Sequence, residues 1–296
     1  PPTRLKNLLD AALAAVVWWL VGYGIAFDGD NPFIGTAAPA ERFMTLGLVA
    51  NDRGGFSTEN SESGYDWASW FFSYTFAATA ATVVSGAVAE RAHLLAYLSY
   101  TLIITLFIYP TVVHWVWSSH GWLSVLNPDA TLDGLFDFAG AGVVHMTGGI
   151  AAFCGAAIIG PRHGRFELRG VDGGAPAPRP HCLSGCGCGA IPGCQGWGLR
   201  GRAVHKRGHS SVLQALGTFI LWMGWYGFNG GSVLKITGDS AATAARACVC
   251  TTLSASAGGL VACFISRYCG FVRTYDVGGM CNGILAGLVS ITAGCA

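Results

Sequence analysis

A carboxylate and an imidazole stand in one of the most apolar parts of this chain, the stretch DFAGAGVVHM at residues 137–146. An ionisable side chain at the middle of a membrane helix costs about 2.5–3.5 kcal/mol on insertion scales, so both residues are functional candidates. On a helix, His145 would lie two turns beyond Asp137 and about 80° around the axis. Each residue also has a purely structural interpretation. Asp137 could cap the start of that helix, and His145 could hydrogen-bond a neighbouring helix.

Aromatic and hydroxyl side chains form further landmarks within apolar runs. They are Trp115 and Trp117 in VVHWVW, Phe72 and Phe76 in WFFSYTF, and Phe228 and Ser232 in WYGFNGGS. Each phenylalanine alone is typical of core or lipid-facing packing, and the tryptophans are equally typical of an interfacial aromatic belt. No nucleophile beside a base, phosphate-binding loop or facing pair of carboxylates can be located, so we predict neither an enzyme nor a cofactor site.

The composition favours a membrane protein. Of 296 residues, 52% are apolar and only 11% are charged, and the mean hydropathy is +0.47. The net charge of +1, with aromatic residues inside apolar runs, excludes a nucleic-acid-binding surface. The 43 glycines suit membrane helices that pack closely.

Seven apolar segments are long enough to be candidate transmembrane helices, so the predicted fold class is an all-α polytopic bundle. The segments are 8–27, 67–88, 94–117, 137–160, 211–228, 241–265 and 277–295. The fifth is short and runs into GFNGGS at 227–232, where we expect the helix to unwind beside a cavity.

Positive charge is distributed unequally between the connecting segments. The amino-terminal tail, the turn at 90–93 and the loops 161–210 and 266–276 together carry 13 of the 17 Lys and Arg residues. We therefore place these segments in the cytoplasm and the acidic segments 28–66 and 118–136 outside. An acidic outer rim would concentrate small cations.

The stretch 170–207 within the loop 161–210 is rich in Gly, Pro and Cys and lacks any helical or strand period, which predicts a disordered cytoplasmic insert. Its potential metal ligands are His181, Cys182, Cys186, Cys188 and Cys194. Their spacing matches no usual zinc pattern, and a disulfide is disfavoured on the reducing side of a membrane. A compositionally biased insert is the preferred interpretation.

Several motifs taken in order resemble the ammonium transporter, methylammonium permease and Rhesus protein family, especially its plant and algal branch. They are GYGIAFDGDNPFIG, SGAVAERAHLLAY, VVHWVWSSHGWL, DFAGAGVVHMTGGIAA, IIGPRHGRF, LGTFILWMGWYGFNGGS and MCNGILAGLVSITAGCA. The resemblance implies an eleven-span homotrimer with one pore per subunit, of which residues 1–296 form a single partial domain from the second span to the eighth. A second pore histidine would lie beyond Ala296, so we expect that this piece alone does not conduct.

The resemblance also implies roles for individual residues. Trp117 and Phe76 would hold ammonium or methylammonium at an outer recruitment site by cation–π attraction, worth about 0.5–2 kcal/mol, and the Ser232 hydroxyl would accept a hydrogen bond from it. Phe76 and Phe228 would close the pore below that site and favour neutral ammonia over a hydrated ion. Asp137 would organise the recruitment site without touching the substrate, and His145 would line the pore.

The expected function is thus ammonium or ammonia transport by an integral protein of the lipid bilayer, in the plasma membrane, with no metal or nucleic-acid partner. One alternative is an ammonium sensor that keeps Trp117 and Ser232 but does not transport. A non-conducting fragment or an incorrect gene model is another. A seven-span receptor matches the span count, but the basic amino terminus predicts the opposite orientation.

Overall fold

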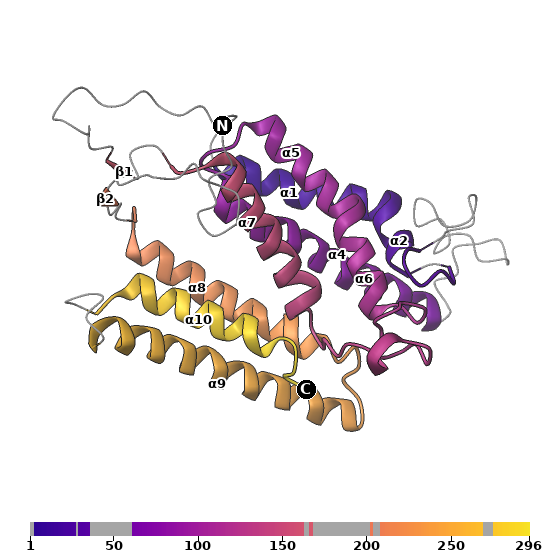
Figure 1. Ribbon diagram of the computed structural model, residues 1–296. Helices are drawn as coiled ribbons and strands as arrows, with labels where there is room; N and C mark the ends of the chain where they lie inside the picture. The colour runs from indigo at the N-terminus through magenta and orange to yellow at the C-terminus, as the bar shows by residue number, and fades with distance from the viewer. Residues whose placement is uncertain are drawn as a thin grey trace. The chain divides into compact units, whose positions relative to one another are not determined.

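In this computed structural model of the chain, the described residues are 3–27, 29–35, 61–162, 166–167, 202–203, 208–268 and 275–296. Almost all of the secondary structure in these residues is helical (Figure 1). Two compact units divide the chain, and each is described by itself. The first comprises Pro1–Trp122 with Met146–Arg207, and the second comprises Leu123–His145 with Gly208–Ala296.

The first unit is built from membrane-length helices, some of which contain a π-helical turn. Its elements are α1 (Thr3–Val17), η1 (Trp18–Gly22), α2 (Tyr23–Phe27), α4 (Ser61–Val88), α5 (Leu94–Ile103), η3 (Ile104–Ile108), α6 (Tyr109–Trp117) and α7 (Thr147–Ile159). Residues 3–27 form one continuous helix, as do residues 94–117. Two short strands, β1 (Phe166–Glu167) and β2 (Arg202–Ala203), pair antiparallel on either side of residues 168–201. Most of the predicted 170–207 insert lies outside the described residues.

The second unit contains three longer helices and three short turns. Its elements are η4 (Thr131–Asp133), the π-helix η5 (Ala141–Met146), α8 (Ser211–Trp225), the π-helix η6 (Tyr226–Gly230), α9 (Asp239–Tyr268) and α10 (Val277–Ile291). The boundary between the units follows His145, within the helical run 141–159. Ser210 caps α8 through Leu213 N–H, and Asp276 caps α10 through Gly278 N–H, because Ser and Asp side chains satisfy the free donors of a first turn.

Five described helices are long and apolar enough to cross a membrane: Leu5–Phe27, Trp67–Val88, Leu94–Trp117, Ala141–Ile159 and Asp239–Ile265. They correspond to five of the seven predicted spans. Of the other two, 277–295 becomes the shorter apolar helix α10, and 211–228 becomes α8 with η6. The expected unwinding at the glycines of 227–232 is wrong for all but the last residue of that motif, because the helix widens into a π-turn at Tyr226–Gly230 and ends only after Gly231.

Glycines bring α9 and α10 into very close contact. A Cβ atom on Gly283 would lie 2.4 Å from the Gly258 carbonyl oxygen, and one on Gly287 would lie 2.2 Å from the Ser254 carbonyl oxygen. The Ser254 hydroxyl donates to the Gly287 carbonyl at 2.8 Å across this contact. Small residues at such crossings allow dispersion contacts between backbones, which replace the hydrophobic driving force that lipid does not provide.

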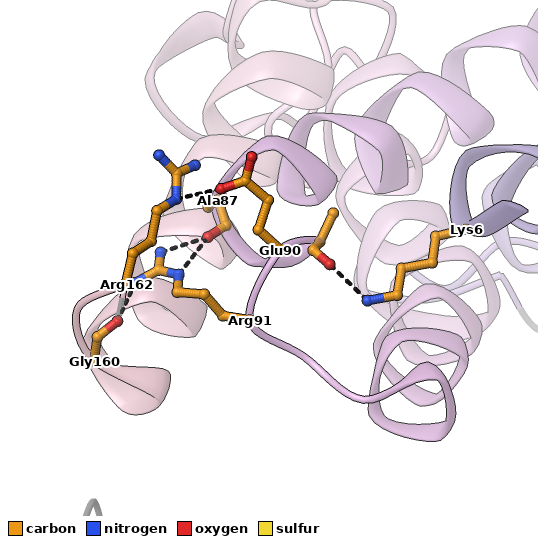
Figure 2. Close-up of polar contacts among 7 residues, drawn as sticks. Lys6, Ala87, Glu90, Arg91, Gly160 and Arg162 are labelled. Atoms are coloured by element: carbon orange, nitrogen blue, oxygen red, sulfur yellow. Dashed lines mark hydrogen bonds and ion pairs between the residues drawn. The ribbon is translucent and has the colours of Figure 1, made fainter. Parts of the chain in front are cut away.

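Basic side chains satisfy free carbonyl groups where α4 and α7 end (Figure 2). Lys6, only 2% exposed, donates from Nζ to the carbonyls of Ala89 (2.6 Å) and Ala92 (2.7 Å). The Arg91 guanidinium donates to the carbonyls of Ala87 and Gly160 and so joins the two helix ends. Helix carboxyl termini carry unpaired carbonyls and partial negative charge, which cations stabilise.

A buried carboxylate lies one helical turn beyond Lys6. Asp10 is fully buried and accepts hydrogen bonds from the Tyr97 and Thr101 hydroxyls of α5. Lys6 and Asp10 therefore fasten α1 to the α4–α5 turn and to α5, respectively. Sequence analysis missed Asp10, because the hydroxyl groups that hydrogen-bond its buried carboxyl group, those of Tyr97 and Thr101, are 87 and 91 residues away.

Gly283→Ala should destabilise the protein by about 1–3 kcal/mol, because the added methyl group overpacks the α9–α10 crossing. Gly217→Ala is the matched control: nothing lies within 4 Å of a Cβ there, so helix propensity alone applies. Thermal unfolding in detergent measures both variants. Equal midpoints would contradict the close packing.

Lys6→Met should cost about 1.5–3 kcal/mol, because the buried Ala89 carbonyl and the partly buried Ala92 carbonyl lose a charged donor. Arg162→Gln serves as the control, since Arg162 pairs with Glu90 at 2.6 Å but both side chains are about half exposed, and such pairs contribute little. Denaturant titration in mild detergent compares the two. A larger loss for Arg162→Gln would refute the assigned role of Lys6.

Candidate functional site

Asp137 caps the helix that leads to His145. Its Oδ1 accepts from the backbone N–H groups of Gly140 (3.0 Å) and Ala141 (2.9 Å). Its Oδ2 accepts from those of Gly142 and Val143, both at 2.8 Å. The carboxylate thus satisfies four free donors of the first turn, as the capping interpretation predicts, and its negative charge faces the positive end of the helix dipole.

The loop that carries Asp137 is fixed to the end of α10. The Phe138 and Ala139 N–H groups donate to the carbonyls of Ala293 and Thr292, both at 3.0 Å. Thr292 in turn accepts from the indole Nε1 of Trp225 at 3.0 Å. These bonds give the start of η5 and the end of α8 a common anchor at Thr292.

His145 lies in the π-turn η5 with its ring between aromatic neighbours. Its imidazole stacks on Trp225, with a centroid separation of 5.1 Å and planes 14° apart, and the Phe228 ring lies 5.5 Å away. The residue is only 7% exposed. Its Nε2 has no hydrogen-bond partner among the described residues. A buried polar atom without a partner is costly, so this nitrogen marks a candidate position for a ligand or water in the second unit, as do Trp222 Nε1 and Asn229 Oδ1.

Phe228 and Ser232 come from η6 and the turn that follows it. The Ser232 hydroxyl donates to the Phe228 carbonyl at 2.8 Å, which leaves its oxygen lone pairs able to accept a hydrogen bond. The neighbouring Asn229 is fully buried and donates to the Thr251 hydroxyl of α9 at 2.9 Å. Tyr226 also bonds α9, through Thr252 at 2.7 Å. Side-chain bonds to α9 therefore hold the π-turn on both sides of Phe228.

The first unit brings together the other two predicted residues, Trp117 and Phe76. Their rings are in edge-to-face contact with centroids 5.9 Å apart. Phe76 is 1% exposed and also contacts Phe72, with centroids 4.5 Å apart. Aromatic pairs prefer such geometry because the positive edge of one ring meets the negative face of the other.

The six predicted site residues thus fall into two groups. Trp117 and Phe76 form one contact in the first unit, whereas Asp137, His145, Phe228 and Ser232 belong to the second. Sequence analysis missed Trp225, which stacks on His145. The signal was present in GWYGFN, since residues 225 and 228 are three apart and lie on one helix face.

No group of three His, Cys, Asp or Glu side chains within the described ranges is arranged to hold a metal ion. The five potential ligands between residues 181 and 194 lie outside those ranges. The six predicted site residues offer aromatic ring faces, one imidazole, one hydroxyl group and one carboxylate that caps a helix.

Known proteins are similar to this chain along nearly all of it. Ammonium transporter 1 member 2 of Arabidopsis thaliana is 39% identical over 306 residues, which cover 99% of this chain and 50% of that protein. Ammonium transporter 1 member 2 of Oryza sativa subsp. japonica is 38% identical, covering 98% of this chain and 51% of the relative. The chain therefore spans about half the length of these relatives.

Solved structures agree with this similarity. A Sensor Amt Protein superposes with a TM-score of 0.72 at 30% identity, covering 98% of this chain and 59% of that one. Saccharomyces cerevisiae Mep2 superposes with a TM-score of 0.70 at 27% identity, covering 99% and 55%. The model of the Ammonium Transporter Family matches residues 3–186 and 195–296, leaving out the first two residues and residues 187–194 in the Cys-rich stretch. The chain is an integral membrane protein that belongs to the Ammonium Transporter Family.

Proposed function

We propose that the full-length protein transports ammonium or ammonia across a membrane through a pore lined by His145. The observation that carries the proposal is the buried Nε2 of His145, which has no partner among the described residues although the ring is held by Trp225 and Phe228. Ammonia or water in a narrow passage would complete the hydrogen bonding of this atom. An imidazole suits the role because one nitrogen donates while the other accepts.

The rings around His145 favour a neutral passenger. Trp225 and Phe228 surround the imidazole with apolar surface, and Phe228 also packs against the buried core cluster of the second unit. A hydrated cation would lose its water there without receiving equivalent ligands, whereas ammonia loses much less. In our proposal Phe228 and Phe76 together form the aromatic gate, which favours neutral ammonia over the hydrated ion.

Recruitment would use the Trp117–Phe76 pair and the Ser232 hydroxyl. The edge-to-face contact between Trp117 and Phe76 holds the two rings in a fixed relative orientation. The Ser232 oxygen keeps its acceptor capacity because its own proton goes to the Phe228 carbonyl. Potassium cannot donate a hydrogen bond, so a hydroxyl acceptor beside an aromatic face selects for ammonium. Bringing these residues into one site is part of the proposal.

Asp137 would act by position and charge, without contacting the substrate. Both carboxylate oxygens are occupied by backbone N–H groups, so little capacity remains for a direct ligand. Its fixed negative charge would nevertheless stabilise a cation nearby. We further propose that the full-length protein is a homotrimer of the plasma membrane.

A second candidate function is ammonium sensing without transport. The Sensor Amt Protein among the similar structures supports it, because that protein covers 98% of this chain. Measurements of methylammonium binding and of methylammonium flux distinguish a sensor from a transporter. A sensor would bind methylammonium, measured by calorimetry, yet give no flux in liposomes. A transporter would give both.

For the full-length protein in liposomes, His145→Ala and Trp117→Ala should each alter methylammonium uptake at least about tenfold, a change equivalent to about 1.4 kcal/mol. The first variant removes the imidazole and its unpartnered Nε2, and the second removes the cation–π surface. Cys186→Ser, in the Cys-rich stretch, should transport like the wild type. Equal uptake in all three variants would remove these site assignments.

A further inference from the structure

We propose that Thr292 is a positioning residue for transport, because its hydroxyl group fixes the Trp225 indole on which the His145 imidazole stacks. This role rests on the proposed function, in which His145 lines the passage. Thr292 is 0% exposed and directly follows the last residue of α10. All three residues belong to the second unit. Thr292 would therefore act on the passenger only through the two stacked rings.

The Thr292 hydroxyl group both donates and accepts a hydrogen bond. Its proton goes to the Leu288 carbonyl, one helical turn earlier, at 2.8 Å. Its oxygen accepts from the Trp225 indole Nε1 at 3.0 Å. An indole N–H can only donate, so it needs an acceptor when it is buried. Because the bond to Leu288 fixes the hydroxyl proton, the lone pairs that receive the indole N–H also have a fixed direction.

The indole that Thr292 holds determines the surroundings of His145. Trp225 is 8% exposed, its plane lies 14° from that of the imidazole, and the Phe228 ring is 5.6 Å from it. Aromatic pairs tolerate centroid separations of about 4.5–7 Å, so stacking alone leaves the indole free to slide. A directed hydrogen bond at the rim of the indole removes this freedom. The place of the imidazole edge that carries Nε2 therefore depends on the bond between Thr292 and Trp225.

The backbone of the same turn holds the loop that leads to His145. The Ala139 N–H donates to the Thr292 carbonyl and the Phe138 N–H donates to the Ala293 carbonyl, both at 3.0 Å. A side-chain substitution at residue 292 removes the hydroxyl group and leaves these backbone groups in place. The contribution of the hydroxyl group can therefore be measured separately.

Loss of the hydroxyl group would leave the Trp225 N–H as another buried polar atom without a partner. A buried donor without an acceptor is unfavourable, so the indole would turn toward water or hold the nitrogen of passing ammonia. Both responses would slow passage beside His145. Recruitment is proposed at other side chains, Trp117, Phe76 and Ser232. The maximal rate of transport should therefore fall, whereas the half-saturation concentration should change little.

Uptake of methylammonium by the full-length protein in liposomes tests this role. Thr292→Val, which has the shape of threonine but lacks the hydroxyl group, should lower the maximal rate about tenfold and change the half-saturation concentration less than about twofold. Thr292→Ser keeps the hydroxyl group and should transport at close to the wild-type rate. Thr218→Val is the matched control, because the buried Thr218 hydroxyl also donates one turn back, to the Gln214 carbonyl at 2.9 Å. The control should transport like the wild type.

The Trp225 indole reports on the bond to Thr292 without any measurement of transport. In ¹⁵N-tryptophan-labelled full-length protein in lipid nanodiscs, the indole signal that disappears in Trp225→Phe is that of Trp225. The exchange of this indole proton with water should be about tenfold faster in Thr292→Val than in the wild type. Thr292→Ser and Thr218→Val should leave the exchange unchanged.

An indole that exchanges equally in Thr292→Val and the wild type, or equal maximal rates for these two proteins, would overturn the positioning role. If Thr292→Val does not fold, Trp225→Phe tests the same bond from the other side, because phenylalanine keeps a ring for the stack but has no N–H. A wild-type maximal rate in Trp225→Phe would also overturn the role. An indole that responds as predicted in a protein without methylammonium flux would instead refute the proposed function.

Discussion

A polar group buried away from water must find a partner, and this constraint explains most of the specific contacts in both units. Asp137 meets it with four backbone donors, and Lys6 and Arg91 meet it for carbonyls at helix ends. Asp10 meets it with two hydroxyl groups. Nε2 of His145 is one of seven buried side-chain atoms in the described part of the chain that have no partner, and in our proposal a passing molecule supplies that partner.

Close packing of α9 against α10 also supports the surroundings of His145, and it depends on glycines. Glycines at the α9–α10 crossing allow Gly283 and Gly287 to approach the backbone of α9. The end of α10 then holds both Trp225 and the loop before η5 through Thr292. The His145 ring stacks on Trp225, and Trp225 is bonded to Thr292 at the end of α10. The orientation of the imidazole therefore depends on the α9–α10 crossing, which is distant in the sequence.

Sequence reasoning predicted the parts of the structure that depend on local pattern. Long apolar runs gave helices because a membrane segment must satisfy its own backbone. Asp137 was predicted as a helix cap because its partners are the next few residues. The π-turn at Tyr226–Gly230 was missed, since glycines after an apolar run indicate a break as readily as a widened turn. Asp10 was missed because its partners are 87 and 91 residues away in the chain. Trp225 was missed although its spacing of three residues from Phe228 places both rings on one helix face.

The central claim is that the free nitrogen of His145 faces a conduit, and an experimental structure of the full-length protein in a lipid nanodisc tests it most directly. The account predicts that the imidazole stacks on Trp225 and that ordered water or ammonia lies within hydrogen-bond distance of Nε2. A ring whose Nε2 is bonded to a protein group, or whose edge faces lipid, would contradict it.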